Sequence, residues 1–568
     1  MKSLRACRFI LVLIVCLAVL SCSGDDGDAG PAGEDGSDGS DSMIYVVYTS
    51  PSPNQTDVKE NSAISIIFNK AMDTSSVEDG TTFFVRDSVD INVPGSITWD
   101  TDNHILTFTP SSDFNSQSTY RVAILGSVTD NAGNIMGYDY IFYFSVMGLG
   151  WGYDRLIEES NEYADHPQIA MDSQGNAIAV WRQDNGTWTN IWASRYTHWG
   201  GWGTPQQINS GSKDAALPQI AMDPQGNAIV VWHQINDASP YNSIRYNKYI
   251  SNYNWVGAMD IVQCVDPNRN VFDPQIAIDD EGNAIAVWKQ GDGTGSFYHI
   301  WSSSCSSQSL LNWTAPERIE PDDGHNSSHP QIAFDTLGNA IAVWWCDPGL
   351  IYANRYTADA GWGTAEQIDA GGLLADQPQV AVEPNGNAVA VWRQSDGIRT
   401  NIWANLYTEG SGWGTAELIE NNDAGAAEKP QAVIDADGNA LAVWQQLASS
   451  SSDIWSNRYT AGVGWGTAEL LETATGWNYL AETPQIAMDS DGNALAVWKQ
   501  GDGTGSWYHI WSNAYTAGTG WGTAEIIEPH DPGNSSNPQI TINQEDNAMA
   551  IWSNYTLGWE DIHVIEKN

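Results

Sequence analysis

A repeating pattern of hydrophobic and polar positions occupies most of the chain, from residue 150 to the end. Each unit carries Pro-Gln, a short apolar alternation, an acid or its amide, a turn, and then Asn-Ala-x-Ala-Val-Trp or a close variant. Alternation with a period of two predicts β-strands, and unit lengths of 48 to 56 residues are typical of propeller blades. In the first unit the predicted strands are 168–171, 176–182, 191–197 and 204–208. The units begin at Pro167, Pro218, Pro274, Pro330, Pro378, Pro430, Pro484 and Pro538.

The two ends of this repeat region predict how it closes. The last unit stops after a third strand, 561–566, whereas residues 151–158 match the fourth-strand motif at 413–420. Pairing the N-terminal strand with the last unit leaves no open sheet edge. We therefore expect an all-β protein in which residues 150–568 form a single eight-bladed propeller of four-stranded blades, closed by this strand.

The repeat region is also internally duplicated. Residues 289–296 recur as 499–506, and residues 179–183 recur as 390–394, an offset of four units. Matching blades of one ring would then face each other across its axis. Two separate four-bladed rings also fit the duplication, but the missing fourth strand favours one ring.

Residues 43–147 show a different pattern of short strands. Alternating runs at 63–68, 95–99, 105–109 and 120–125 are separated by clusters of Asn, Asp, Ser and Gly, which predicts a β-sandwich. The motifs FNKAMD at 68–73, LTFTP at 106–110 and DNAGN at 130–134 resemble the bacterial Ig-like domain of the S-layer SbsA type. The resemblance implies a spacer or adhesive module without catalytic residues.

The N-terminus carries an export signal. Lys2, Arg5 and Arg8 precede an apolar run at 9–20, and residues 1–21 have the layout of a secretory signal peptide because that run is too short to span a bilayer. The tetrad VLSC at 19–22 resembles the bacterial lipobox, which implies a lipid on Cys22 and a protein of the cell envelope, outer membrane or cell surface. Cleavage by an ordinary signal peptidase at a nearby small residue is the alternative.

Residues 22–42 form a Gly-rich acidic linker. Gly recurs at every third position from 24 to 39, with GPA at 30–32, which resembles a collagen-like segment. The acids within this run repel one another, so an extended linker is favoured over a stem that forms trimers.

The acidic composition and the few cysteines limit the partners that this chain can bind. The chain has 568 residues, with 70 Asp plus Glu against 23 Lys plus Arg and a formal net charge of −47. This balance repels phosphate backbones, so we expect no nucleic-acid partner. Besides Cys22, the predicted mature chain keeps Cys264, Cys305 and Cys346, which leaves one disulfide with one free thiol open but provides no CxxC pair for zinc.

The turns DADGN at 435–439 and DSDGN at 489–493 resemble half a calcium loop. Their middle acid is replaced by Gln, Leu or Asn in other units, so the shared role is the turn. We expect neither a metal nor another cofactor. The Trp within each second strand, such as Trp181, is expected in the core.

Function is expected on one rim of the ring. The first-to-second and third-to-fourth turns are nearly uniform (D-x-x-G-N and G-W-G-T), whereas the second-to-third turns and the connections between units vary; we call these the uniform rim and the variable rim. Variable loops on a rigid scaffold usually carry recognition. The candidate ligand-binding residues on the variable rim are Arg182, Trp188, His233, Lys289, Tyr298, His299, Arg393, Lys499, Trp507, Tyr508 and His509.

Several candidates follow the second-strand Trp directly, where they would form a cationic ring near the mouth of the channel. The alternative is that each cation pairs with a neighbouring acid, such as Glu158, Glu159 or Asp165.

These features predict a non-enzymatic surface protein that binds a glycan or another surface protein. No H-E-x-x-H, G-x-S-x-G or Walker motif is present in the sequence, and no catalytic residue is assigned. The alternatives are a propeller glycoside hydrolase or lyase of the sialidase-like kind, which would show two carboxylates about 5 to 9 Å apart beside the ring, or a purely structural surface protein.

Overall fold

A computed structural model describes the chain from residue 43 to 567. Short gaps in this range lie at 53–54, 59–61, 88–90, 113, 115–118, 147–150, 153, 159–161, 198–200, 237–238, 252, 308–311, 322–323, 372–373, 422–424, 448–450, 473–478, 506, 529–532, 545 and 557. The predicted signal peptide, Cys22 and the linker 22–42 lie outside the described residues. The described residues form strands and two short 3₁₀ turns, Thr74–Ser76 and Pro267–Arg269, but no α-helix. No helix among them is long and apolar enough to cross a membrane.

The chain divides into two compact units between Ser145 and Val146. The first unit has two four-stranded sheets, and Phe83 of one packs on Phe108 of the other with ring centroids 5.5 Å apart. Alternate residues of its third strand, such as Ile64 and Phe68, are buried between the sheets. This is the β-sandwich that the alternation predicted. One sheet is β1 (Val46–Ser50), β3 (Ile64–Phe68), β6 (Ile105–Pro110) and β5 (Gly95–Trp99); the other is β2 (Gln55–Val58), β8 (Tyr140–Val146), β7 (Thr119–Ile124) and β4 (Phe83–Arg86).

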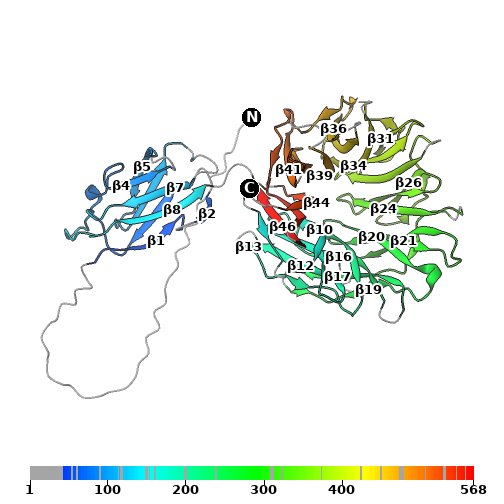
Figure 1. Ribbon diagram of the computed structural model, residues 1–568, viewed down its shortest axis with the longest axis horizontal. Coiled ribbons are helices and arrows are strands. Elements are labelled where there is room, and N and C mark those ends of the chain that lie inside the picture. Colours follow the sequence, from blue (N-terminus) through cyan, green and yellow to red (C-terminus); the bar gives the residue numbers. More distant parts are fainter. Residues whose placement is uncertain are drawn as a thin grey trace, which may run out of the picture. The chain divides into compact units, whose positions relative to one another are not determined.

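The described residues of the second unit form eight antiparallel sheets, called sheets 1 to 8 in chain order, which follow one another around a ring (Figure 1). The first strands are β10 (Ala164–Met171), β15 (Ala215–Met222), β20 (Val271–Ile278), β24 (Ser327–Phe334), β29 (Ala375–Val382), β34 (Ala426–Ile434), β39 (Ala481–Met488) and β44 (Asn534–Ile542). The second strands are β11 (Ala177–Asp184), β16 (Ala228–Ile235), β21 (Ala284–Gly291), β25 (Ala340–Cys346), β30 (Ala388–Ser395), β35 (Ala440–Leu447), β40 (Ala494–Gly501) and β45 (Ala548–Thr556).

The third strands are β12 (Thr189–Thr197), β17 (Asn242–Ile250), β22 (Tyr298–Cys305), β26 (Leu350–Thr357), β31 (Thr400–Thr408), β36 (Ser452–Thr460), β41 (Tyr508–Thr516) and β46 (Trp559–Lys567). The fourth strands are β13 (Gly201–Trp202) with β14 (Gln206–Gln207), β18 (Asn254–Trp255) with β19 (Met259–Val262), β23 (Glu317–Arg318), β27 (Gly361–Trp362) with β28 (Glu366–Gln367), β32 (Gly412–Trp413) with β33 (Glu417–Leu418), β37 (Gly464–Trp465) with β38 (Glu469–Leu470), β42 (Gly520–Trp521) with β43 (Glu525–Ile526), and β9 (Arg155–Leu156).

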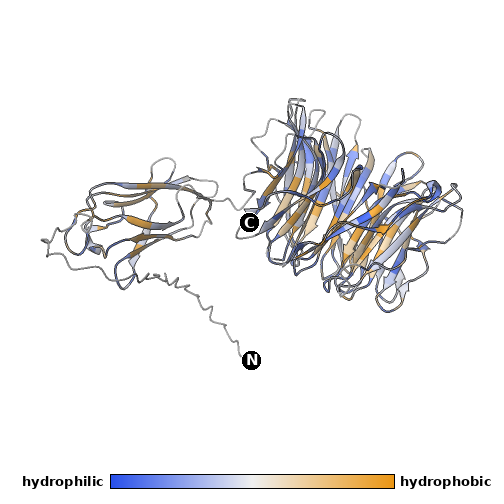
Figure 2. Ribbon diagram, turned by 90° about the horizontal axis from the view of Figure 1, so that it is seen from below, coloured by the Kyte–Doolittle hydropathy of each residue, from blue (hydrophilic) through white to orange (hydrophobic). Residues whose placement is uncertain are grey.

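The second strand of each sheet is buried on both faces. Its run Ala-x-Ala-Val-Trp packs against the sheet before it, so that Trp392 of sheet 5 lies in one cluster with Ile341 and Val343 of sheet 4. The apolar stretches follow the strands (Figure 2). All eight second-strand Trp side chains have no exposed surface, which confirms their predicted core role. In six sheets the indole N–H donates to the Gln two residues later, as in Trp392 to Gln394 at 2.9 Å.

The fourth strand departs from the prediction of one continuous strand. In six sheets two short pieces both pair with the third strand, and the strand is interrupted after a Gly-Trp pair in five of them and after Asn254–Trp255 in sheet 2. At this break a third-strand Asn links two sheets: Asn457 Nδ2 donates to the Gly466 carbonyl (3.2 Å) and to the Ile419 carbonyl of the preceding sheet (2.8 Å). Asn354, Asn405 and Asn513 repeat this arrangement. The break therefore lets the side-chain amide hold neighbouring sheets together.

The N-terminal strand joins the last sheet, as the sequence predicted. Leu156 of β9 lies opposite His563 of β46, and the Ile157 amide donates to the Ile562 carbonyl at 3.0 Å. Trp181 of sheet 1 shares a core cluster with Ile562 of sheet 8 and with Ile157, the residue after β9. Strand β10 also contacts β44, β45 and β46. The first and last sheets are therefore packed against each other.

We expect Ile157→Pro to loosen both ends of the ring, because proline removes the amide that bonds to Ile562. Hydrogen exchange should rise across β44–β46 and across β10–β12. Ile419→Pro is the matched control, since the Ile419 amide makes the same 3.0 Å bond to the Ile402 carbonyl within sheet 5. If both variants raise exchange only in their own sheet, β9 does not fasten the first sheet to the last.

Candidate functional site

Each first strand carries the same distortion where it enters the ring on the variable rim. Between two successive paired positions, the first strand advances by three residues while the second strand advances by two. The first strand therefore has one extra residue, which forms a β-bulge next to the repeated proline. The residue before that proline has a φ between 52° and 55° in every sheet. Left-handed backbone costs an L-residue roughly 1 to 2 kcal/mol, so the recurrence marks a built feature. These residues are His166, Leu217, Asp273, His329, Gln377, Lys429, Thr483 and Asn537.

The residue after each second-strand Trp lies opposite the residue at the start of this bulge. Arg182 faces Asp165, and its guanidinium makes two hydrogen bonds to that carboxylate, one of them Nε to Oδ1 at 2.6 Å. Burial would raise the pKa of Asp165, but its bonds to His166 and Arg182 outweigh burial and hold that pKa below its usual value. Arg182 is therefore a paired cation.

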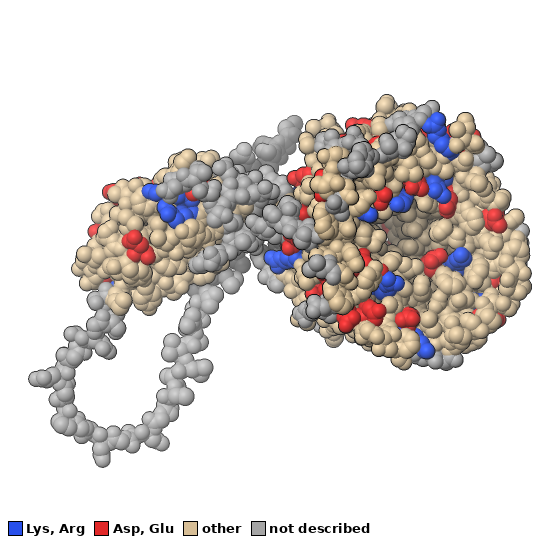
Figure 3. Space-filling view, viewed as in Figure 1, with Lys and Arg blue, Asp and Glu red and all other residues tan. Residues whose placement is uncertain are grey.

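Arg393 links two sheets in the same way. Its guanidinium contacts Asp376 across the strand pair and Glu428 of sheet 6, both at 3.3 Å. His329 of sheet 4 reaches the same Asp376 at 3.3 Å, and this hydrogen bond raises the pKa of His329. Figure 3 shows Lys and Arg alternating with Asp and Glu around the hollow of the ring. The mouth is thus a ring of mixed charge rather than a purely cationic one.

The remaining ring candidates have aromatic neighbours. Lys499 pairs with Glu482 at 3.5 Å and lies 4.1 Å from the centre of the Tyr508 ring. Lys289 lies 4.9 Å from the Tyr298 ring. His233 meets Phe272 edge-on, with ring centroids 6.3 Å apart, and burial lowers its pKa.

The other predicted candidates occupy turns or the interior of the sheets. Trp188 lies under Lys213, at 5.1 Å, and Trp507 is 43 % exposed. His299 is only 1 % exposed and pairs with Glu320 at 2.7 Å, while His509 pairs with Glu528 at 3.5 Å. His299 is therefore too buried to contact a ligand, and both imidazoles support the strand that carries the preceding Tyr.

The duplicated loops at 291–297 and 501–507 have the same local chemistry. Asp292 accepts from the amides of Thr294 and Gly295, and Asp502 accepts from Thr504. Glycine is favoured at their centres because Gly293 and Gly503 have φ values of 86° and 81°. A Cβ would also lie 2.9 Å from the Arg269 guanidinium in the first loop and 2.3 Å from the Tyr479 ring in the second. Loops that differ only in their last residue, Phe297 or Trp507, thus rest on different neighbours, a cation in sheet 3 and an aromatic ring in sheet 7.

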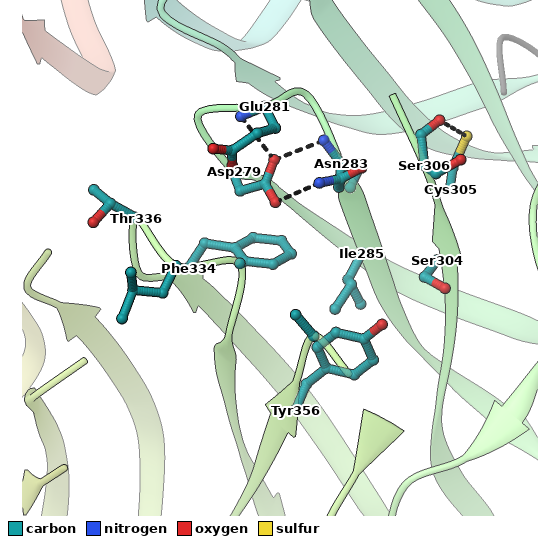
Figure 4. Close-up of a pocket in the computed structure, with 14 residues that line it drawn as sticks. Asp279, Glu281, Asn283, Ile285, Ser304, Cys305, Ser306, Phe334, Thr336 and Tyr356 are labelled. Carbon is teal, nitrogen blue, oxygen red and sulfur yellow. Dashed lines mark hydrogen bonds between the residues drawn. The ribbon is translucent and has the colours of Figure 1, made fainter. Parts of the chain in front are cut away.

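A cavity of about 520 Å³ lies between sheets 3 and 4 on the uniform rim (Figure 4). Ile285, Phe334 and Tyr356 line its apolar side, together with Cys305. Cys305 lies opposite the first Ala of the second strand, the position at which six other sheets carry Tyr. A small side chain in a column of tyrosines leaves space unfilled. Aligning the units of the sequence shows Cys at this third-strand position where six other units have Tyr, and this difference could have predicted the cavity.

The acids of the D-x-x-G-N turns are used by the turns themselves. Asp435 accepts from the Asp437 and Asn439 amides and from the Asn439 side chain, and Asp489 does the same in its own turn. No group of three or more potential metal ligands occurs among the residues that the structure describes. Cys264, Cys305 and Cys346 are buried free thiols, so the disulfide left open by the sequence is not formed.

One buried acid has a strongly raised pKa. Burial raises the pKa of Glu472 to about 9, with a further contribution from neighbouring Asp453. The Glu472 carboxyl accepts from the Ile454 amide at 2.8 Å. Burial disfavours the charged carboxylate, so Glu472 holds a proton at neutral pH.

Comparison with known proteins supports the division of the chain. Residues 41–146 match the family model described as the bacterial Ig-like domain. The first folded unit is a bacterial Ig-like domain. No curated protein matches the chain.

The second unit has propeller-like neighbours among solved structures. They include an α-L-arabinofuranosidase from Fusarium graminearum (11 % identity, 73 % of this chain and 97 % of that chain, TM-score 0.36). They also include a lectin from Aleuria aurantia (12 % identity, 56 % of this chain and 97 % of that chain, TM-score 0.30). A third is the β-propeller domain of the trilobed protease from Pyrococcus furiosus (9 % identity, 65 % of this chain and 96 % of that chain, TM-score 0.39). These identities and scores carry no argument about activity.

Replacing Glu472 by Gln should remove a pH dependence. The folded chain keeps a proton on Glu472 that the unfolded chain loses above about pH 4.5, so stability falls as the pH rises from about 4.5 towards about 9. The Gln side chain of Glu472→Gln is neutral in both the folded and the unfolded state. The melting temperature of this variant should therefore rise relative to that of the unsubstituted protein as the pH increases from 5 to 8. Thermal unfolding measures this, with exposed Glu469→Gln as the control; a constant difference across the pH range would contradict it.

Cys305→Tyr should fill the cavity without loss of stability, because six other sheets accommodate Tyr at this position. The reverse change, Tyr407→Cys in sheet 5, should lower the free energy of unfolding by about 2 to 4 kcal/mol. Urea unfolding compares the two variants. Equal destabilisation by both would show that the cavity is not the space left by a missing tyrosine.

Proposed function

We propose that this chain is an exported bacterial lipoprotein that displays a ligand-binding propeller at the cell surface. The signal peptide 1–21 directs export, Cys22 carries the lipid, and the linker 22–42 leads to an SbsA-type Ig-like spacer at 43–147. Residues 150–568 form one closed eight-bladed propeller, whose blades are sheets 1 to 8. The order of these segments along the chain supports the proposal: an export signal is followed by a lipid attachment site, a linker, a spacer domain and then the propeller.

The ligand is a glycan or a surface protein, bound at the mouth of the ring on the variable rim. The observation that carries this proposal is the ring of Arg182, Arg393 and Lys499, held by the carboxylates opposite them and flanked by turns with exposed aromatic groups such as Trp507. Side chains fixed by ion pairs present a preorganised polar surface, which lowers the entropy lost on binding.

A glycoside hydrolase or lyase on the same rim is the second reading. It needs a free carboxylate pair at the ring. The ring acids Asp165, Asp376, Glu428 and Glu482 each contact a cation instead. This arrangement favours binding over hydrolysis.

A glycan array probed with the full chain tests the proposal. Trp507→Ala and Tyr508→Ala should each weaken glycan binding by about tenfold, since each removes an aromatic surface for stacking, about 1.4 kcal/mol of binding free energy. Tyr253→Ala is the control, because Tyr253 is 82 % exposed in a third-to-fourth turn on the uniform rim. Absence of any glycan binding would reject the lectin form of the proposal.

A further inference from the structure

Lys289 differs from the other Lys and Arg side chains of the ring. Arg182, Arg393 and Lys499 each lie opposite a carboxylate on the first strand, whereas the residue opposite Lys289 is Phe272. Among the described residues, Lys289 forms no ion pair, and its contact is with the face of the Tyr298 ring. A partly buried ammonium without a counter-ion favours a ligand that brings a negative charge.

Aromatic side chains surround this cation. Phe272 lies between Tyr298, with ring centroids 6.0 Å apart, and His233 at 6.3 Å. The Nδ1 atom of His233 is buried and has no hydrogen-bond partner in the structure. This buried atom is out of a ligand's reach, so His233 serves as one wall of the aromatic group.

An acceptor also lies within reach of this group. Asp273, the left-handed residue after Phe272, lies close enough to two imidazoles to act on them: it opposes the burial that lowers the pKa of His233, and it adds to the Asp376 bond that raises the pKa of His329. Lys289 likewise lies close to His329. A carboxylate next to the Phe272 ring can accept from the hydroxyls of a ligand whose acid group meets Lys289.

We propose that Lys289, Tyr298 and Phe272 bind a uronic-acid residue of an acidic glycan. The Lys289 ammonium pairs with the sugar carboxylate, the aromatic rings contact the C–H face of the sugar, and the Asp273 carboxylate accepts from its hydroxyls. This inference rests on the proposed function and gives its ligand a chemical class.

A sugar acid fits these residues better than the carboxyl end of a peptide. Asp273 supplies an acceptor, which suits a ligand with several hydroxyl donors, whereas a peptide backbone offers single N–H groups. The chain's net charge of −47 disfavours densely charged polyanions. Isolated acidic residues in a largely neutral glycan avoid that repulsion, because charges farther than about 8 Å are screened at physiological salt.

An array that prints uronic-acid oligosaccharides beside their carboxyl-reduced counterparts tests the proposal with the full chain. The acidic forms should bind at least about tenfold more tightly than the reduced forms, the effect of one charge-assisted contact. Lys289→Met should abolish this preference, and Lys289→Arg should keep it. Phe272→Asp should also abolish it, since it places opposite Lys289 the acid that Arg182 and Arg393 already face.

Lys213→Met is the control for charge, because Lys213 lies on the same rim outside this group. It should leave the preference for the acidic forms unchanged. Equal binding of acidic and reduced forms would overturn the uronic-acid inference and leave the proposed glycan binding intact. No glycan binding would remove both, and binding only of peptides with a free C-terminal carboxylate would assign Lys289 to a protein partner instead.

Discussion

Burial of the second strand between two neighbouring sheets is the constraint on which the ring depends. Its Ala-x-Ala-Val-Trp run is apolar on both faces, so a sheet of this kind is stable only when other sheets cover it. Each Trp side chain, burying about 150 to 250 Å², is covered by residues of the preceding sheet, as Trp392 is by Ile341 and Val343. A row of such sheets would leave the second strand of its first member uncovered. Packing Trp181 against Ile562, with β9 paired to β46, removes that exposed face.

The same constraint explains where variation is tolerated. The buried strands and the D-x-x-G-N turns have little freedom, because the turn acids are saturated by backbone amides and the Asn links are repeated between sheets. The entry of each first strand has more freedom. There the bulge holds one left-handed residue per sheet, and that residue ranges from Leu217 to Asp273 to Lys429. A rigid ring thus presents a set of chemically different side chains at fixed spacing.

Much of this architecture could be predicted from the sequence, because period-two alternation and the repeated Pro-Gln motif report on strands directly. The pairing of residues 151–158 with the last unit was readable from a missing strand. The interruption of the fourth strand could not be predicted, because it depends on hydrogen bonds from an Asn side chain to the carbonyl of a neighbouring sheet. Cys305 was counted as a candidate for a disulfide, and its effect on packing emerges only when the tyrosines at the same register are aligned. The pairing of Arg393 with both Asp376 and Glu428 likewise depends on contacts between sheets.

The candidate site shows how duplication can produce unlike sites from like sequences. Sheets 3 and 7 carry the same Lys, the same DGTGS loop and the same Tyr-His pair. Their cross-strand partners differ: Lys499 faces Glu482, and Lys289 faces Phe272. Their loop supports differ as well, Tyr479 in one case and Arg269 in the other. An ion pair satisfies Lys499 within the chain, whereas Lys289 faces an aromatic ring and forms no ion pair among the described residues. The chemical environment of each cation is therefore decided by the first strand that faces it, and a comparison of the repeated loops alone would treat the two sheets as equivalent.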